Sequence, residues 1–160
     1  MNKVLTLLTV LFFASPVVAA ERVRIFVQAN GTDHAGARLA SALRDQIASS
    51  PRYILADGTR DALFVLYLST LDPDGGGLKT TFARALTRYR ASPSLTDINL
   101  SELFEYQNVG VCGKGQIDSC ASGVMALVDA RVVALRPKIE SEIDSQIKAA
   151  DEELRRLNRK

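Results

Sequence analysis

Hydrophobic and polar residues alternate along this chain with two periods, one typical of strands and one typical of helices. The two-residue period predicts the strands. Val23, Ile25 and Val27 alternate with polar neighbours, which is the period of a strand with one buried face. The run at residues 61–71 is apolar on both alternations, which predicts a central strand covered on both faces. The glycine-rich stretch at residues 72–77 predicts a hairpin turn, and a polar connection is expected at residues 91–99. The predicted strands lie at residues 23–28, 52–55, 61–71, 79–90 and 103–111.

Two other segments repeat their apolar residues at helical spacing. Thr32 or Asp33 can cap the first helix. Its apolar stripe consists of Gly36, Leu39, Ala40, Leu43 and Ile47. Asp118 or Ser119 can cap the second helix, and Pro137 is expected to kink or end it. The buried positions predicted for that helix are Ala121, Val124, Met125, Val128, Val132 and Leu135.

The resulting order, β-α-β-β-β-β-α, predicts an α+β fold: a mixed, mostly antiparallel sheet of about five strands with two helices on one face. We expect residues 21–137 to form this single domain and residues 138–160 to form a charged, amphipathic helical tail. The a/d spacing of a coiled coil continues through the tail at Ile143, Ile147, Ala150, Leu154 and Leu157. Because two helices already cover the sheet, the tail is predicted to bind a partner or to form a homodimer through residues 141–160, although it could also fold back.

The first 20 residues have the pattern of a secretory signal peptide. Lys3 gives a positive start, residues 4–14 are apolar, and small residues precede an expected cleavage site between Ala20 and Glu21. The apolar run is too short for an uncleaved anchor, which needs roughly 20 residues. No cysteine that could accept a lipid lies near the cleavage site. The mature chain is therefore expected in the periplasm, without a lipid anchor or a transmembrane segment.

Composition and charge narrow the expected partners. The chain is 47% hydrophobic, which is enough for an ordinary core. Cleavage would remove one of its 20 basic residues and none of its 18 acidic residues, which leaves a net charge of +1. So small a charge gives no reason to expect nucleic acid or bulk anionic lipid as a partner.

The only two cysteines, Cys112 and Cys120, bracket a glycine-rich turn that leads into the second helix. They are too far apart for a thioredoxin-like pair, and the chain has one histidine, so neither a redox motif nor a zinc site is indicated. The glycines match no nucleotide-binding motif, although Lys114 near the helix start is a candidate anion ligand. In an oxidising compartment the pair predicts a disulfide, with a reversible redox switch as the alternative. No metal or cofactor is predicted.

The remaining polar candidates have simple structural interpretations. His34 lies beside Asp33 and could be a general base, but no nucleophile accompanies it, so a surface histidine is favoured. Asp72 and Asp74 could be imagined as calcium ligands, yet the stretch lacks the spaced carboxylates of a calcium loop. A hairpin turn is therefore the preferred interpretation.

Arg84, Arg88 and Arg90 fall on one face of their predicted strand by alternation. Together with Lys114 they are the candidate anion-binding residues, suited to a glycan or a lipid head group. The alternative is a solvated face, partly paired with Glu102 and Glu105 across the hairpin.

The chain also resembles the small envelope α/β domains of the TolB amino-terminal, CsgG and penicillin-binding-protein-activator type. The resemblance rests on Ser50, Arg52 and Tyr53 between a helix and a strand, followed by a strand led by Asp61 and Ala62. It covers roughly residues 23–135. It implies a protein that binds partners in the cell envelope and has no catalytic activity. The chain departs from that pattern because it lacks the lipidated cysteine and adds a charged tail.

Two functional classes follow. The favoured one is a periplasmic accessory protein, non-catalytic, that binds an envelope protein or a peptidoglycan-associated partner. The alternative is a small periplasmic ligand-binding protein or enzyme with a site at the glycine-rich turn, residues 110–120. The single histidine, the absence of tryptophan and the lack of clustered carboxylates favour the first class.

Overall fold

The fold is built on one five-stranded sheet in the order β2-β1-β3-β4-β5. It was obtained as a computed structural model, which describes residues 22–31, 33–92 and 99–158. The strands are β1 (Val23–Asn30), β2 (Tyr53–Leu55), β3 (Phe64–Leu71), β4 (Lys79–Ser92) and β5 (Asn99–Gly113). The helices are α1 (His34–Ser49) and α2 (Ile117–Leu157), with single 3-10 turns η1 (Thr59–Asp61) and η2 (Lys114–Gln116). The predicted α+β class and the predicted order of elements are confirmed.

The sheet is mixed. β1 runs parallel to β2 and β3, whereas β3–β4 and β4–β5 are antiparallel and carry the longer ladders. β4 and β5 are longer than predicted, because their pairing continues to Ser92 and Asn99. Those two residues and Ala91 therefore belong to strands and not to the expected polar connection. Residues 93–98 of that connection lie outside the described residues.

The start of α1 follows from a side-chain cap. Asp33 is the N-cap, and its Oδ1 accepts a hydrogen bond of 2.6 Å from the backbone N–H of Gly36. Thr32, the other predicted cap, lies outside the described residues. A Cβ at position 36 would overlap Oγ1 of Thr70, so the close approach of α1 to β3 requires a glycine there.

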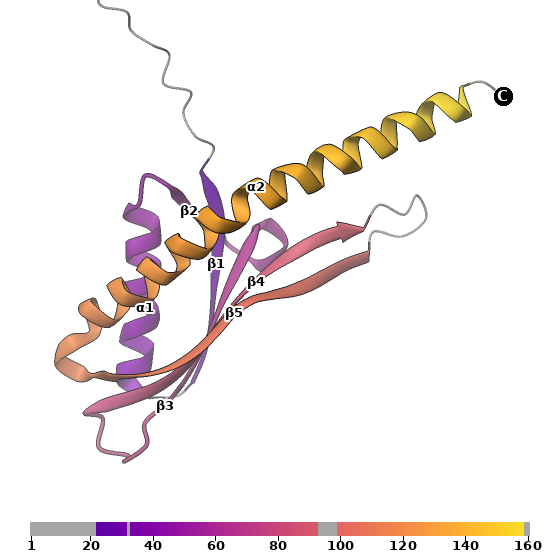
Figure 1. The fold of residues 1–160 in the computed structure, drawn as a ribbon. Helices are drawn as coiled ribbons and strands as arrows, with labels where there is room; N and C mark the ends of the chain where they lie inside the picture. The colour runs from indigo at the N-terminus through magenta and orange to yellow at the C-terminus, as the bar shows by residue number, and fades with distance from the viewer. Residues whose placement is uncertain (1–21, 32, 93–98, 159–160) are drawn as a thin grey trace, which may run out of the picture.

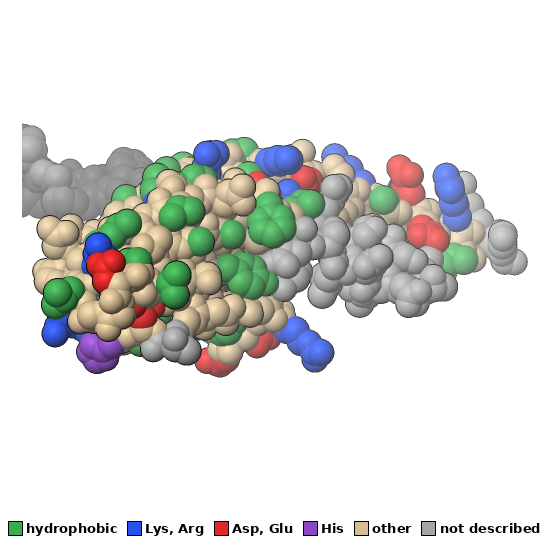
Figure 2. Space-filling view, turned by 90° about the horizontal axis from the view of Figure 1, so that it is seen from below, with side chains coloured by type: hydrophobic (Ala, Val, Ile, Leu, Met, Phe, Trp, Pro, Cys, Tyr) green, Lys and Arg blue, Asp and Glu red, His purple; other side chains and the backbone are tan. Residues whose placement is uncertain are grey.

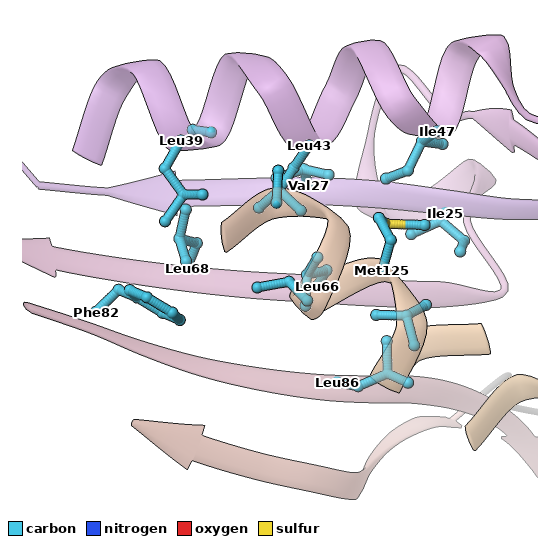
Figure 3. Close-up of a cluster of buried hydrophobic side chains, with 14 of the residues drawn as sticks. Ile25, Val27, Leu39, Leu43, Ile47, Leu66, Leu68, Phe82, Leu86 and Met125 are labelled. Carbon is cyan, nitrogen blue, oxygen red and sulfur yellow. The ribbon is translucent and has the colours of Figure 1, made fainter. Parts of the chain in front are cut away.

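Both helices pack on one face of the sheet and share one core (Figure 1). Figure 3 shows Leu39, Leu43 and Ile47 pointing from α1 toward the sheet, while Met125 reaches into the same core from α2. The predicted stripe of α1 is buried throughout. β3 lies at the centre of the sheet and alternates between this core and a smaller cluster on the other face around Val65, as its two-sided apolar pattern predicts.

α2 differs from the prediction at its N-cap, and it excludes one of the two outcomes expected at Pro137. It begins at Ile117, with Gln116 as its N-cap, and so neither Asp118 nor Ser119 caps it. Pro137 does not end the helix, which continues through it to Leu157. Pro137 is exposed, so water can hydrate the carbonyl that its missing N–H leaves unpaired. Contacts of Val132 and Ile139 with the core fix the helix on either side of the proline.

The two parts of α2 have different surroundings. The buried residues of the helix are Ile117, Ala121, Val124, Met125, Val128, Val132 and Ile139. No residue of α2 after Ile139 is buried, and Figure 1 shows this part of the helix running out beyond the sheet. We call residues 140–157 the projecting helix. Among the described residues, no helix is long and apolar enough to span a membrane.

Candidate functional site

The cysteine pair lies at disulfide distance, as predicted. The sulfur atoms of Cys112, on β5, and Cys120, in the first turn of α2, are 2.23 Å apart, and their Cα atoms are 6.1 Å apart. Between them, the backbone N–H of Lys114 donates a 2.7 Å hydrogen bond to the carbonyl of Leu78. The side chain of Lys114 is exposed on η2. The glycine-rich turn thus connects an edge strand of the sheet to the start of α2.

Arg88, one of the candidate anion ligands, is engaged by two carboxylates. Its side chain is buried, and its Nε donates to Glu105. Its Nη1 and Nη2 donate to the two carboxylate oxygens of Glu142, over 2.9 Å and 3.4 Å. Burial alone would lower the pKa of Arg88, but the hydrogen bonds to Glu142 and Glu105 outweigh it and raise that pKa. The expected pairing with Glu105 is present, whereas the expectation of a solvated face is wrong here, because α2 covers this side of β4.

Arg84 takes part in a stack of rings and guanidinium groups. Its Cζ lies 5.5 Å from the ring centroid of Phe82 and 5.9 Å from that of Tyr106, and Arg131 of α2 lies 5.3 Å from the same Tyr106 ring. A hydrogen bond from Asn108 and, after it, the neighbouring Arg84 lower the pKa of Tyr106. The structure therefore places two arginines around one aromatic side chain.

The three predicted anion ligands whose side chains are described do not form one cluster. Arg84 stacks on aromatic rings, Arg88 is neutralised by two carboxylates, and Lys114 lies on the turn after β5. Arg90 pairs with Ser101 in the β4–β5 ladder, and its side chain lies outside the described residues. Anion binding by this set stays a prediction.

The other polar candidates lie at the surface, with His34 and Asp74 exposed and Asp72 partly buried. His34 is the first residue of α1 and is exposed. Asp72 closes the turn between β3 and β4, where its carboxylate accepts hydrogen bonds from the backbone N–H groups of Asp74 and Gly77. Asp74 forms an ion pair of 2.8 Å with Lys79. This is the hairpin turn that the sequence analysis preferred. Within the described part of the chain, no group of three metal-ligating residues comes together.

The projecting helix carries a row of apolar side chains that the domain covers only in part. Ile143, Ile147, Leu154 and Leu157 are 49%, 55%, 58% and 57% exposed. Together with Ala150 they lie at the a/d positions of one helix face. A surface helix normally turns such a stripe toward a core, whereas here about half of each side chain is exposed.

A second surface lies on the sheet face opposite the helices. Phe104, Val109 and Val111 of β5 are exposed there, and β5 is an edge strand. In Figure 2, hydrophobic side chains are spread over the middle of the viewed surface and charged side chains lie mostly around its margins. An exposed edge with apolar neighbours can accept an added strand, but nothing in the structure selects an occupant for it.

A groove opens where α2 leaves the sheet, and the sequence analysis missed it. It has a volume of about 860 Å³ and lies between the starts of β1 and β3, η1 and the middle of α2. Its lining includes apolar residues and four arginines: Arg22, Val23, Arg24, Arg60, Asp61, Ala62, Leu63, Phe64, Val132, Arg136, Ile139, Glu140 and Ile143. These residues come from three segments that are distant in the sequence. No local pattern could have assembled them.

Comparisons with known proteins do not assign a family. No family model matches the sequence, and no curated protein matches it. Among solved structures, the chain is similar to the hypothetical protein CT253 from Chlamydia trachomatis, with 10% sequence identity and a TM-score of 0.32. That match covers 57% of this chain and 72% of the other. A likeness this weak carries no argument about function, and the resemblance to TolB-like envelope domains stays a prediction.

Proposed function

We propose that this protein is a secreted, non-catalytic accessory protein of the bacterial periplasm that binds an envelope partner through its projecting helix. The observation that carries the proposal is the exposed a/d stripe on residues 140–157. The signal-peptide pattern supports the location, and a cysteine pair at disulfide distance agrees with an oxidising compartment. The resemblance to small envelope domains supports a role in binding.

The energetics of the projecting helix favour a partner. An isolated helix of this length is marginal in water, because nucleation is costly and tertiary contacts normally supply the stability. The isoleucine and leucine side chains of its stripe are about half exposed, so they supply only part of that stability within the domain. Because about half of each side chain is still exposed, burying the rest against a partner stabilises the complex by about 0.8–1.5 kcal/mol per side chain. A helix with a similar stripe would cover all of them at once.

The base of the projecting helix is fixed to the sheet. Ile139 packs against the core, and one turn later Glu142 holds Arg88 of β4 with both carboxylate oxygens. A bidentate contact to a buried arginine restricts orientation more than a single contact does. The direction in which the stripe is presented is therefore set before a partner arrives, which reduces the entropy lost on binding.

The partner would present an apolar helix of its own, either on an envelope protein or on a second copy of this chain. The projecting helix has its glutamates and aspartates between residues 140 and 153 and its arginines at 155 and 156. Two copies in antiparallel orientation would bring the acidic part of one helix beside the basic end of the other. Two parallel copies would place like charges together. A homodimer through residues 141–160 is therefore expected to be antiparallel.

The test compares two kinds of aspartate substitution on the same helix. Ile147→Asp and Leu154→Asp place a charge in the stripe, whereas Ala149→Asp adds the same charge outside it. Sedimentation velocity reports self-association, and co-purification from envelope extract after crosslinking reports an envelope partner. We expect the two stripe variants to lose association and the control to keep it. Equal loss in all three variants, or a wild-type protein that is monomeric and captures nothing, would contradict the proposal.

A further inference from the structure

The groove beside η1 combines an apolar floor with a positively charged rim. Val132 and Ile139, 5% and 9% exposed, are core residues in its lining, and Phe64 is fully buried. The more exposed Leu63 and Ile143 supply most of the apolar surface that a ligand could contact. The rim is formed by charged side chains from β1, η1, α2 and the residue before β1. These are Arg22, Arg24, Arg60 and Arg136, with Asp61 and Glu140. The rim therefore has a net charge of +2 from four arginines and two carboxylates.

Two of the rim arginines have guanidinium groups available to a ligand. Arg22 donates to the carbonyl groups of Ser50 and Tyr53, so its head group is already used. Arg24 and Arg60 are exposed, and within the described residues neither makes a side-chain hydrogen bond or an ion pair. A guanidinium group offers five N–H donors in a planar fork that matches a carboxylate or a phosphate.

We propose that this groove binds an anionic amphiphile: a molecule with a single acyl chain and a carboxylate or phosphate head group. The chain lies on the apolar floor, and the head group contacts the arginines of the rim. The groove has the size of a small-molecule site, which is typically about 300–1,000 Å³. A purely polar anion would leave the floor exposed, and a neutral amphiphile would leave Arg24 and Arg60 without an anion. The groove shares Glu140 and Ile143 with the start of the projecting helix, whereas its other lining residues lie outside that helix.

The experiment uses the secreted full chain and four probes below their micelle-forming concentrations. Dodecanoate and dodecyl phosphate carry the two anionic heads on one chain length, dodecyl maltoside has the same chain with a neutral head, and acetate has the head without the chain. Isothermal titration calorimetry measures each Kd. We expect saturable binding, with one site per chain, for the two anionic amphiphiles and weak or no binding for the other two probes. The ratio of the first two Kd values distinguishes a carboxylate site from a phosphate site.

Variants connect that binding to the groove. Arg24→Gln combined with Arg60→Gln should weaken the binding of anionic amphiphiles about three- to tenfold, the effect expected for two exposed charge contacts. Arg38→Gln removes an exposed arginine of α1 that does not line the groove, and it should leave the Kd unchanged. Thermal melting of each variant checks that the fold is intact.

Three results would overturn the proposal. Dodecyl maltoside could bind as tightly as dodecanoate, which would make the groove an apolar surface without head-group recognition. The double variant could bind the anionic amphiphiles as the wild type does, which would place them elsewhere. The wild-type protein could also show no saturable binding of either anionic amphiphile.

Discussion

The two parts of α2 belong to one continuous helix but have different relations to the sheet. From Ile117 to Ile139 the helix buries a residue on nearly every turn, and its apolar face completes the core. From residue 140 onward the same kind of stripe continues with its side chains about half exposed. Hydrophobic periodicity alone therefore does not determine burial. What differs is whether another element lies opposite the stripe.

Where the two parts of α2 meet, ion pairs connect the helix to the sheet. Arg88 of β4 is buried between Glu105 of β5 and Glu142 of α2. Removing one partner of a buried pair costs more than the pair itself contributes, because a desolvated charge remains. We therefore expect the stability of the domain to depend on residues up to Glu142 and to be insensitive to those beyond it.

The largest contrast should come from placing the same charge in each part. Val124 is fully buried, so Val124→Asp should lower the free energy of unfolding by about 4 kcal/mol or more, or prevent folding. Leu154→Asp should change it by no more than about 0.5 kcal/mol, the usual range for surface substitutions. Chemical denaturation of both variants measures the difference. Comparable losses would show that the projecting helix packs on the domain.

The cysteine pair should stabilise only the packed part. Closing a loop with a sequence separation of 8 residues contributes roughly 2.5 kcal/mol on the chain-entropy model, so Cys112→Ser should cost about 2–4 kcal/mol. Thiol titration of the denatured protein without reductant should detect no free thiol. Two titratable thiols in protein recovered from the periplasm would contradict the disulfide.

The ion pairs of Arg88 with Glu105 and Glu142 should have an intermediate effect on the free energy of unfolding. Glu142→Gln leaves Arg88 with Glu105 alone and should lower the free energy of unfolding by about 1–3 kcal/mol. Glu153→Gln, on the exposed part of the same helix, is the matched control and should have almost no effect. If both variants melt like the wild type, the contact between Arg88 and Glu142 does not fix the helix to the sheet.

A smaller effect on stability should follow the protonation of Asp33, the N-cap of α1. Burial alone would raise the pKa of Asp33, but polar groups around its carboxylate, among them the backbone N–H of Gly36, outweigh burial and lower that pKa below its ordinary value of 3.8. A lowered pKa in the folded state contributes stability that is fully present above pH 3.8 and is lost as the pH falls through the folded-state pKa. Asp33→Ala should therefore cost about 1 kcal/mol at neutral pH, and the cost should shrink at lower pH. A cost that does not change with pH would argue against this titration.

Local patterns were enough to predict most of the fold. Alternation identified the strands, and the a/d and i/i+4 patterns identified both helices, because each depends on residues close in sequence. Pro137 was predicted to kink or end the helix, and it does not end it. Whether a proline ends a helix depends on hydration of the freed carbonyl and on core contacts, here those of Val132 and Ile139, that lie outside any local window.

The sites were less predictable than the fold. The cysteine pair could be inferred from count and compartment, and strand alternation placed Arg84 and Arg88 on one face. Alternation does not say which face a helix will cover, so the burial of Arg88 by Glu142, 54 residues away, was not foreseen. The groove was missed for the same reason, because Arg60 and Arg136 meet there only after folding.

The central claim is that the projecting helix serves binding and not folding. Deleting residues 147–160 tests it most directly, because this truncation keeps Arg88, Glu142 and Ile143 in place. Thermal melting and sedimentation velocity, with co-purification from envelope extract, are measured on the truncated and full chains. We predict an unchanged melting temperature together with loss of self-association or of partner capture. A truncated protein that unfolds or loses most of its stability would show that the tail is part of the core, and one that still associates would place the binding surface elsewhere.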